Sequence, residues 1–467
     1  MSALKGKLRL DGDDHNIRRF DIISRSTNQR DVSKTILKQY TLLFLGFVLS
    51  SHVAFANGST LPPVEETTTL DSQKPLYAVI IDAGSTGSRV FAFRFRTSTE
   101  NGSPVLESEL FHQEKPGLSS YADNPIEATK SLGILVEKAK SAIPSSEWGD
   151  TPLLLKATAG LRLLPADKAN RILEVTRNFL NSSGFQLNEN SVSIMEGVDE
   201  GIFSWVTANF LLGRFSQQGT QSLVAVIDLG GGSTQVTYRP NEENIKALNH
   251  SIHNISVFNQ KMSVFTHSYL GMGLMAARKA ILVPKSAAKN ENGIVVVHSK
   301  CFDPLANAAW KYGSQDYEVM GSAENAPEVD QNSTKDGDKS SSNKFEDCLN
   351  LVKNYTNTIE NRPVGLNKED IFAFAYYFDR TSEVGLIDRK MGGKITLEDI
   401  HKTALEACNI GNREQPFMCL DLTYIYSLLT DVYGLNPENN LQISDSISGH
   451  QLNWALGLAL NMLQSKF

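Results

Sequence analysis

Two segments of the chain repeat one pattern: a continuous apolar run ends at an aspartate, a Gly/Ser-rich turn follows, and apolar residues resume. The first copy occupies residues 76–90 and the second residues 223–236, with Asp82 and Asp228 at equivalent positions. Continuous Val/Ile runs are typical of buried strands, and glycine permits the positive φ of a tight turn. The pattern therefore predicts two strand–turn–strand units in a duplicated fold.

Two further segments lie between these copies. Residues 153–162 indicate a strand that enters a small-residue turn, with Thr158 and Arg162 as its polar candidates. Residues 193–205 predict a helix that carries three carboxylates in or beside its first turn (Glu196, Asp199 and Glu200). By position alone, these carboxylates are partners of the helix dipole, and Thr158 is a helix cap.

Near the N-terminus, residues 40–56 contain no Lys, Arg, Asp or Glu. As a helix they reach about 25 Å, which is close to the thickness of a bilayer core. Residues 1–39 carry nine Lys/Arg against five Asp, and positive flanks stay in the cytosol. We therefore expect a cytosolic tail at 1–39, a type II transmembrane signal anchor at 40–56, a stalk at 57–75 and a lumenal domain. Cleavage near Ala56, which would release a secreted protein, remains the alternative.

The composition and net charge exclude some classes of function. The chain has 467 residues, of which 41% are hydrophobic and 21% charged, so it is large enough for two or three globular domains. Its net charge of −7 excludes a general nucleic-acid binder, because such a protein presents a basic face. Since the tail contributes +4, the predicted lumenal part carries −11.

Several features downstream of the predicted anchor are those expected of a lumenal domain. Seven Asn-x-Ser/Thr acceptors predict N-glycans: Asn57, Asn101, Asn181, Asn249, Asn254, Asn332 and Asn354. The four cysteines allow three disulfide connectivities, of which loop lengths favour Cys301–Cys348 with Cys408–Cys419, and free buried thiols are the alternative. The polar stretch 322–342 predicts a surface loop, whose base the first disulfide would close.

The duplicated turns carry the candidate chemistry. Backbone N–H groups in Gly-rich turns bind anions, and hydroxyl groups add donors at Ser85, Thr86, Ser88 and Ser233. Two facing turns of this kind are a way to hold both ends of a polyphosphate. Because Asp82 and Asp228 would repel a phosphate, they imply an intervening Mg²⁺ or Ca²⁺, held through its waters.

Five ordered motifs resemble the conserved regions of the apyrase, or ectonucleoside triphosphate diphosphohydrolase, family. They are residues 82–89 (DAGSTGSR), 157–162 (ATAGLR), 200–209 (EGIFSWVTAN), 228–235 (DLGGGSTQ) and 453–457 (NWALG). The segments at 115–119, 156–165, 266–271 and 374–380 are most similar to the intracellular nucleoside diphosphatase branch, types five and six. The resemblance covers about residues 76–460.

The resemblance implies an α/β fold of two actin/Hsp70-like (RNase H-like) lobes with the active site in the cleft between them. Lobe I would comprise 76–205 plus 446–467, and lobe II 206–445. Glu200 would activate the attacking water with help from Ser233 and Gln235, and metal-bound waters would contact Asp82, Asp228, Thr158 and Trp454. The substrate would bind Gly84, Ser85, Thr86, Gly87, Ser88, Arg89, Thr158, Gly230, Gly231 and Gly232, with Tyr377 stacking on the base.

The expected activity is divalent-metal-dependent hydrolysis of nucleoside diphosphates (UDP, GDP, IDP) to monophosphate and phosphate in the Golgi or ER lumen. Residues 271–274 lack the arginine that cell-surface family members carry near the base, which fits the diphosphatase branch. Such an enzyme would remove the nucleoside diphosphates left by glycosyltransferases. A broader triphosphatase, or another actin-fold phosphotransferase such as an exopolyphosphatase or sugar kinase, is the alternative. An Hsp70-like chaperone would need a separate peptide-binding domain, for which no residues remain.

Overall fold

The computed structural model describes residues 74–98, 104–215, 222–248, 251–258, 260–322, 344–410 and 413–464. The predicted tail, anchor, stalk up to residue 73 and most of the polar loop at 322–342 lie outside these ranges. Ser72–Phe467 form one compact unit. In the described part of the chain, none of the helices combines the length and the apolar character that a membrane span requires.

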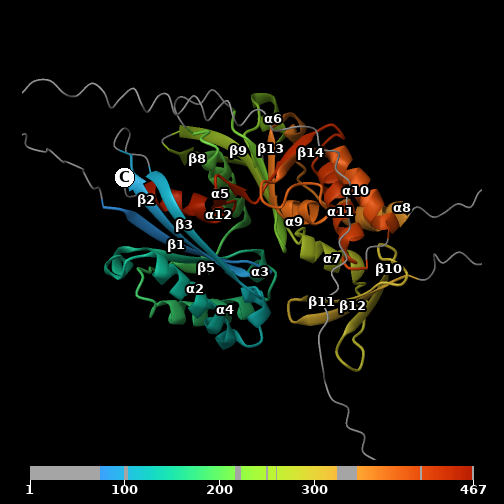
Figure 1. Cartoon of the computed structure of the whole chain (residues 1–467), viewed down its shortest axis with the longest axis horizontal. Coiled ribbons are helices and arrows are strands. Elements are labelled where there is room, and N and C mark those ends of the chain that lie inside the picture. The colour runs from blue at the N-terminus through green and yellow to red at the C-terminus, as the bar shows by residue number, and fades with distance from the viewer. Residues whose placement is uncertain are drawn as a thin grey trace, which may run out of the picture. The chain divides into compact units, whose positions relative to one another are not determined.

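Two sheets organise the described residues (Figure 1). Sheet 1 has the order β3-β2-β1-β4-β5, with strands β1 (Leu76–Ala83), β2 (Ser88–Thr97), β3 (Pro104–Glu114), β4 (Leu153–Ala157) and β5 (Val192–Ile194). Sheet 2 has the order β14-β15-β13-β6-β7-β9-β8, with strands β6 (Ala225–Leu229), β7 (Ser233–Tyr238), β8 (Ile252–Val257), β9 (Gln260–Leu270), β13 (Ile371–Ala375), β14 (Gly393–Thr396) and β15 (Asn440–Ile443).

The two sheets share one topology. In sheet 1, β1 pairs with β2 antiparallel and with β4 parallel, and in sheet 2, β6 pairs with β7 antiparallel and with β13 parallel. The order β9-β7-β6-β13-β15 therefore repeats β3-β2-β1-β4-β5, with β8 and β14 added at the edges. The predicted strand–turn–strand repeats are confirmed as β1–β2 and β6–β7, and so is the α/β class.

Helices cover both faces of sheet 1. On one face α2 (Ala128–Ala142) contacts β2 and β3, and α4 (Ala166–Leu180) contacts β5. On the other face, α12 (Trp454–Gln464) contacts β1 and β2 and packs along α5 (Gly197–Leu211). Because both faces are covered, the strands read as continuous apolar runs rather than as alternating patterns.

The α5–α12 pair also contacts sheet 2, so it lies between the two sheets (Figure 1). Their shared core contains Ile80 and Phe93 from sheet 1 and Val226 from sheet 2, together with Trp205 and Trp454 from the two helices. Trp205 donates its indole N–H to the Val224 carbonyl at 2.8 Å, so this buried polar atom is satisfied. The helix predicted within 193–205 is α5, which begins at Gly197 because residues 192–194 form β5. It forms the central layer between the two sheets.

The outer face of sheet 2 carries the remaining helices and a small third sheet. The helices are α7 (Leu274–Leu282), α8 (Lys344–Thr356), α9 (Tyr376–Glu383), α10 (Leu397–Ile410) and α11 (Met418–Ser427), followed by the π-helical turn Leu428–Val432. The third sheet has the order β10-β12-β11, with β10 (Val295–Ser299), β11 (Asn307–Tyr312) and β12 (Gln315–Gly321). The shorter elements are α3 (Ala159–Arg162), α6 (Glu242–Ala247), β16 (Ser446–Ile447), β17 (His450–Gln451) and the 3₁₀ turns Leu118–Tyr121, Pro125–Glu127, Ser145–Asp150 and Leu366–Lys368.

Two disulfides tie this outer region together. Cys301 bonds to Cys348 and Cys408 bonds to Cys419, with Cα–Cα distances of 4.7 and 4.5 Å. Both predicted pairings are confirmed, and no free cysteine remains in the described ranges. Cys301 precedes α8 and Cys348 lies within it, so the longer crosslink holds that helix beside the third sheet.

Candidate functional site

Strand alternation carries two aspartates to the same layer. Along β1, Ala78 and Ile80 face the shared core, and Asp82 follows with the same parity. Along β6, Val226 faces this core, and Asp228 follows in the same way. Because side chains two residues apart lie on one face of a strand, both carboxylates point into the space between the sheets.

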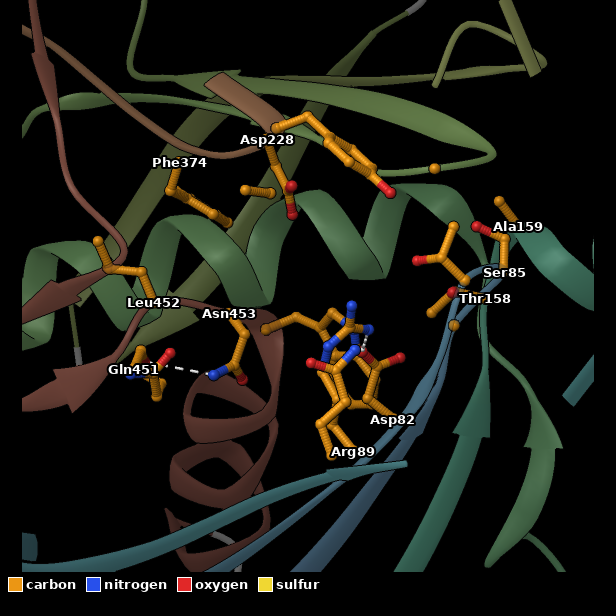
Figure 2. Close-up of a pocket in the computed structure, with 18 of the residues that line it drawn as sticks. Asp82, Ser85, Arg89, Thr158, Ala159, Asp228, Phe374, Gln451, Leu452 and Asn453 are labelled. Atoms are coloured by element: carbon orange, nitrogen blue, oxygen red, sulfur yellow. Dashed lines mark hydrogen bonds and ion pairs between the residues drawn. The ribbon is translucent and has the colours of Figure 1, made fainter. Parts of the chain in front are cut away.

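A cavity of about 430 Å³ occupies this space (Figure 2). Most of the site residues that the sequence predicts line it: Asp82, Gly84, Ser85, Thr86, Arg89, Thr158, Glu200, Asp228, Gly230, Gly231, Gly232, Ser233 and Trp454. They come from both strand–turn–strand repeats, from the start of α3, from α5 and from α12. Residues of all five motifs therefore line the same cavity.

The two Gly-rich turns lie against each other at this cavity. A Cβ at Gly231 would lie 2.5 Å from Ser85 Oγ and 2.7 Å from Thr86 Cγ2, distances that real side chains do not adopt. Gly160 lies equally close to the Ser85 backbone, where a Cβ would approach Cα to 2.9 Å. Glycine at 160 thus lets α3 approach the backbone of the first turn, and glycine at 231 leaves space for the Ser85 and Thr86 side chains. The backbone amides of both turns can then approach one ligand.

Three buried carboxylates face the inner part of the cavity: Asp82, Asp228 and Glu200. Burial raises the pKa of Asp82, and charge and hydrogen bonding from Arg89 together with a hydrogen bond from Trp454 offset part of that rise. Burial raises the pKa of Asp228 well above its ordinary value, and the charges of Glu200 and Asp82 add to the effect. Arg89 Nη1 lies 3.1 Å from Asp82 Oδ2, and Asp82 Oδ1 is buried without a hydrogen-bond partner.

These carboxylates suit a cation that is bound through water. An unpartnered buried oxygen together with mutually repelling carboxylates is stabilised by a positive charge between them. Among the described residues, no group of three or more His, Cys, Asp or Glu side chains has the geometry of direct metal ligands. The carboxylates of Asp82 and Asp228 fit a divalent cation that keeps its water shell.

Glu200 is the centre of a hydrogen-bonded group. Its Oε2 accepts from Arg162 Nη2 and, at 3.3 Å, from Gln235 Nε2. Gln235 Nε2 also lies 2.8 Å from Ser233 Oγ and 2.8 Å from Ser268 Oγ. Burial raises the pKa of Glu200 to about 7, while the Arg162 charge lowers it and the Asp82 charge raises it. A carboxylate with this pKa, one engaged oxygen and a neighbouring hydroxyl can accept a proton from water.

Three predicted substrate residues do not line the cavity: Gly87, Ser88 and Tyr377. Gly87 packs against the Gln113 side chain, Ser88 is buried in β2, and Gln235 reaches the cavity only through its hydrogen bonds to Glu200 and Ser233.

The structure does not bring Tyr377, predicted to stack on the base, to the cavity. Its ring is fully buried in the core outside sheet 2, whereas the preceding Tyr376 and the following Phe378 line the cavity. Ala375, at φ 58° and ψ −125°, turns the chain from β13 into α9. Because neighbouring residues on a helix point about 100° apart, this turn sets which aromatic side chain faces the cavity.

Sequence reasoning missed several lining residues. They are Phe111 and Gln113 from the end of β3, Lys115 directly after it, Asp379 from the first turn of α9, and Asp445, Gln451 and Asn453 from the segment before α12. None belongs to the Gly-rich turns, but Lys115 and Asp379 lie in segments that resemble the diphosphatase branch (115–119 and 374–380), and Asn453 lies in the fifth family motif (453–457). The sequence therefore predicted part of their contribution to the cavity, but not the role of each residue.

Comparisons of sequence and of structure identify relatives of this chain among nucleoside phosphatases. The profile of the GDA1/CD39 (nucleoside phosphatase) family matches residues 68–467. The nucleoside diphosphate phosphatase ENTPD5 of Homo sapiens is 37% identical over 401 residues, covering 84% of this chain and 89% of that protein. Ectonucleoside triphosphate diphosphohydrolase 6 of Homo sapiens is 35% identical over 403 residues, covering 85% and 79%. Among solved structures, nucleoside triphosphate hydrolase of Neospora caninum has a TM-score of 0.56 at 15% identity, covering 84% of this chain and 93% of that chain, which supports the fold.

Proposed function

Because the chain belongs to the GDA1/CD39 (nucleoside phosphatase) family, we propose that it hydrolyses nucleoside diphosphates to nucleoside monophosphates and phosphate. The observation that carries the proposal is the group formed by Glu200, Ser233 and Gln235 beside two facing Gly-rich turns. The name of the human relative ENTPD5, a nucleoside diphosphate phosphatase, supports diphosphates as the substrate class.

The chain's own residues supply positioning and proton transfer. The amides of residues 84–86 and 230–232, with the Ser85 and Thr86 hydroxyls, hold the phosphate oxygens. Glu200 accepts the proton of a water that Ser233 and Gln235 orient for attack on the terminal phosphorus. Arg162 engages one carboxylate oxygen of Glu200 and leaves the other for the water.

A divalent cation completes this proposal. Bound near Asp82 and Asp228, with Thr158 and Trp454 beside its waters, Mg²⁺ or Ca²⁺ would neutralise the phosphate charge and polarise the phosphorus–oxygen bonds. Without it, three carboxylates would face an anionic substrate across a small cavity. The need for the cation thus follows from the charges of the site.

The compartment is part of the proposal. We infer a lumenal enzyme of the Golgi or ER, held by the signal anchor at 40–56 and linked to glycosyltransferases through the nucleoside diphosphates that they release. The acceptors Asn181, Asn254 and Asn354 are exposed, as N-glycosylation requires. The two disulfides fit an oxidising lumen.

The test measures phosphate release by the purified full-length chain from UDP, GDP, ADP and ATP, with Mg²⁺, Ca²⁺ or EDTA. We expect EDTA-sensitive cleavage of diphosphates, and a Glu200→Gln variant about 10² to 10⁴ slower in kcat. Glu174→Gln, an isosteric change on α4 outside the cavity, is the control and should keep the wild-type rate. A Glu200→Gln variant with full activity, or activity that is unchanged by EDTA, contradicts the mechanism.

A further inference from the structure

The segment 266–271 resembles the diphosphatase branch in sequence, yet the proposed mechanism uses none of its residues. Residues 266–270 form the end of β9, which pairs antiparallel with β7. In this pairing Ser268 lies directly opposite Gln235. Because cross-strand partners project from the same face of a sheet, the Ser268 side chain lies beside the amide that orients the attacking water.

Helix α5 begins directly over Ser268. A Cβ at Gly197, the first residue of α5, would lie 2.5 Å from Ser268 Oγ, so a glycine is needed for the helix to approach this closely. One turn later, a Cβ at Gly201 would lie 2.6 Å from Thr266 Oγ1. The two glycines let α5 lie close against β9, with Glu200 between them in sequence. The half-buried Ser268 hydroxyl is therefore held between the helix and the sheet, next to the proposed base.

The Gln235 amide nitrogen has more acceptors around it than it has hydrogens. Its Nε2 lies 2.8 Å from Ser233 Oγ, 2.8 Å from Ser268 Oγ and 3.3 Å from Glu200 Oε2. An amide NH₂ group donates two hydrogen bonds, and the two shorter distances assign them to the hydroxyl oxygens. Glu200 Oε2, the most distant of the three acceptors, then receives at most a share of one hydrogen.

We propose that Ser268 is a positioning residue, which holds the Gln235 amide in the orientation that leaves Glu200 free to accept the proton of the attacking water. The proposal rests on the nucleoside diphosphatase function. Ser268 accepts one N–H of Gln235 and Ser233 accepts the other, so the amide cannot turn a hydrogen fully onto the carboxylate. Ser268 and Gln235 do not line the cavity, whereas Glu200 and Ser233 do. Ser268 therefore acts on the reaction through these neighbours.

Removal of the Ser268 hydroxyl leaves one N–H of the buried Gln235 amide without its acceptor. A buried donor without a partner costs free energy, so the amide turns until it reaches another acceptor. Glu200 Oε2 is already 3.3 Å away. A full hydrogen bond to this oxygen stabilises the ionised carboxylate and makes it a weaker base toward water. The loss therefore falls on the chemical step and not on substrate binding.

The test measures kcat and KM for UDP and GDP with Mg²⁺ in the full-length chain and its Ser268→Ala variant. We expect kcat to fall about 5- to 20-fold and KM to stay within about twofold. The matched control is Thr266→Val, which removes a hydroxyl from the same face of β9. Thr266 Oγ1 lies 2.7 Å from Thr237 Oγ1 and so pairs with another hydroxyl instead of with the Gln235 amide. This control should keep kcat within about twofold of the wild type.

A double-mutant cycle determines whether Ser268 acts through Gln235. Because Gln235→Ala removes the amide, Ser268→Ala should change kcat less than about twofold in that background. Thermal unfolding of each variant verifies that it is folded at the assay temperature. Equal losses of kcat in the two backgrounds would show that Ser268 acts independently of the amide, which overturns the proposal.

Two further results would also overturn the positioning role in an active enzyme. An equal loss of kcat in Thr266→Val would mean that any hydroxyl between α5 and β9 has this effect. A raised KM at unchanged kcat in Ser268→Ala would mean that Ser268 supports substrate binding instead. A wild type that cleaves no nucleoside diphosphate contradicts the proposed function itself, and the role of Ser268 with it.

Discussion

At the scale of single residues, the short Gly-rich motifs were predictable because their chemistry is local. A carboxylate at the end of a strand, followed by glycines, predicts a turn from that segment alone. Asp82 and Asp228 lie on the face where the alternation of side chains along each strand places them. The aromatic residues that line the cavity beside β13 could not be placed in this way. One unusual backbone conformation, at Ala375, decides whether Tyr377 or its neighbours face the cavity, and no sequence pattern encodes it.

Arg162 was noticed in the sequence as a polar candidate, but its partner was not. It lies at the end of α3, 38 residues before Glu200, and the pairing depends on the packing of β4 beside β1. Its side chain is mostly buried and also reaches Ser233 Oγ at 3.3 Å. It therefore acts on the proposed base and on the hydroxyl that orients the water.

The pH dependence of the activity should report this contact. Because burial raises the pKa of Glu200 to about 7, the base is increasingly protonated below that pH, and kcat should fall on the acidic side. A bound cation favours the carboxylate, so the midpoint lies at or below this value. Arg162→Gln removes a charge that favours the carboxylate, so it should move the acidic limb to higher pH and lower the maximal rate by up to about 10²-fold.

Arg162→Lys, which keeps the charge, should shift the pH limb less. The control is Arg171→Gln on the exposed face of α4, where the arginine pairs with Asp167. The measurement is kcat against pH from about 5 to 9 at saturating Mg²⁺. An unshifted acidic limb in Arg162→Gln would mean that the guanidinium does not act on the base.

At the scale of elements, α5 and α12 pack unusually closely. A Cβ at Gly457 would overlap the carbonyl oxygen of Phe203 on α5. The Gly457 backbone N–H donates to Thr207 Oγ1 at 2.8 Å, so a backbone group of one helix bonds to a side chain of the other. Sequence pattern predicted α5, but the face that each helix turns to the other depends on both sheets and could not be predicted from one segment.

Gly457→Ala should therefore lower the free energy of unfolding by about 1 to 3 kcal/mol, because the helices must separate or shift to fit a methyl group. Gly133→Ala in α2 is the matched control, since its Cβ would meet only Phe179 Cζ at 3.7 Å. That change should be neutral or stabilising by up to about 1 kcal/mol through helix propensity. Thermal and urea unfolding of the two variants measures the difference, and equal stabilities would show that α12 has room beside α5.

At the scale of the whole molecule, the duplication was visible in sequence only at the two strand–turn–strand units. The parallel strands β4–β5 and β13–β15 complete the same topology with no shared motif. The pairing of strands that are distant in sequence depends on packing rather than on a local sequence pattern. The strand order of each sheet could therefore not be predicted from the sequence. The disulfides were predictable because few connectivities exist for four cysteines.

The two crosslinks should differ in their contribution to stability. Cys301–Cys348 closes a separation of 47 residues and Cys408–Cys419 one of 11. Because the longer loop has more entropy in the unfolded chain, a Cys301→Ser/Cys348→Ser variant should lose about 1 kcal/mol more than a Cys408→Ser/Cys419→Ser variant. None of these cysteines lines the cavity, so activity at low temperature should persist in both. The reverse order of unfolding free energies would contradict this account.

The shared α5–α12 layer also sets an order of events during synthesis. Sheet 1 is complete at β5, yet one of its faces is covered by α12, which is made only after the whole of sheet 2. Until then, Ile80, Phe93 and their neighbours on that face lack part of their packing partner. A growing chain therefore exposes an apolar surface for some 260 residues of translation, between Ile194 and Trp454. Exposed surface of this kind invites chaperone binding and aggregation, so the amino-terminal half depends on the carboxyl-terminal segment for a soluble fold.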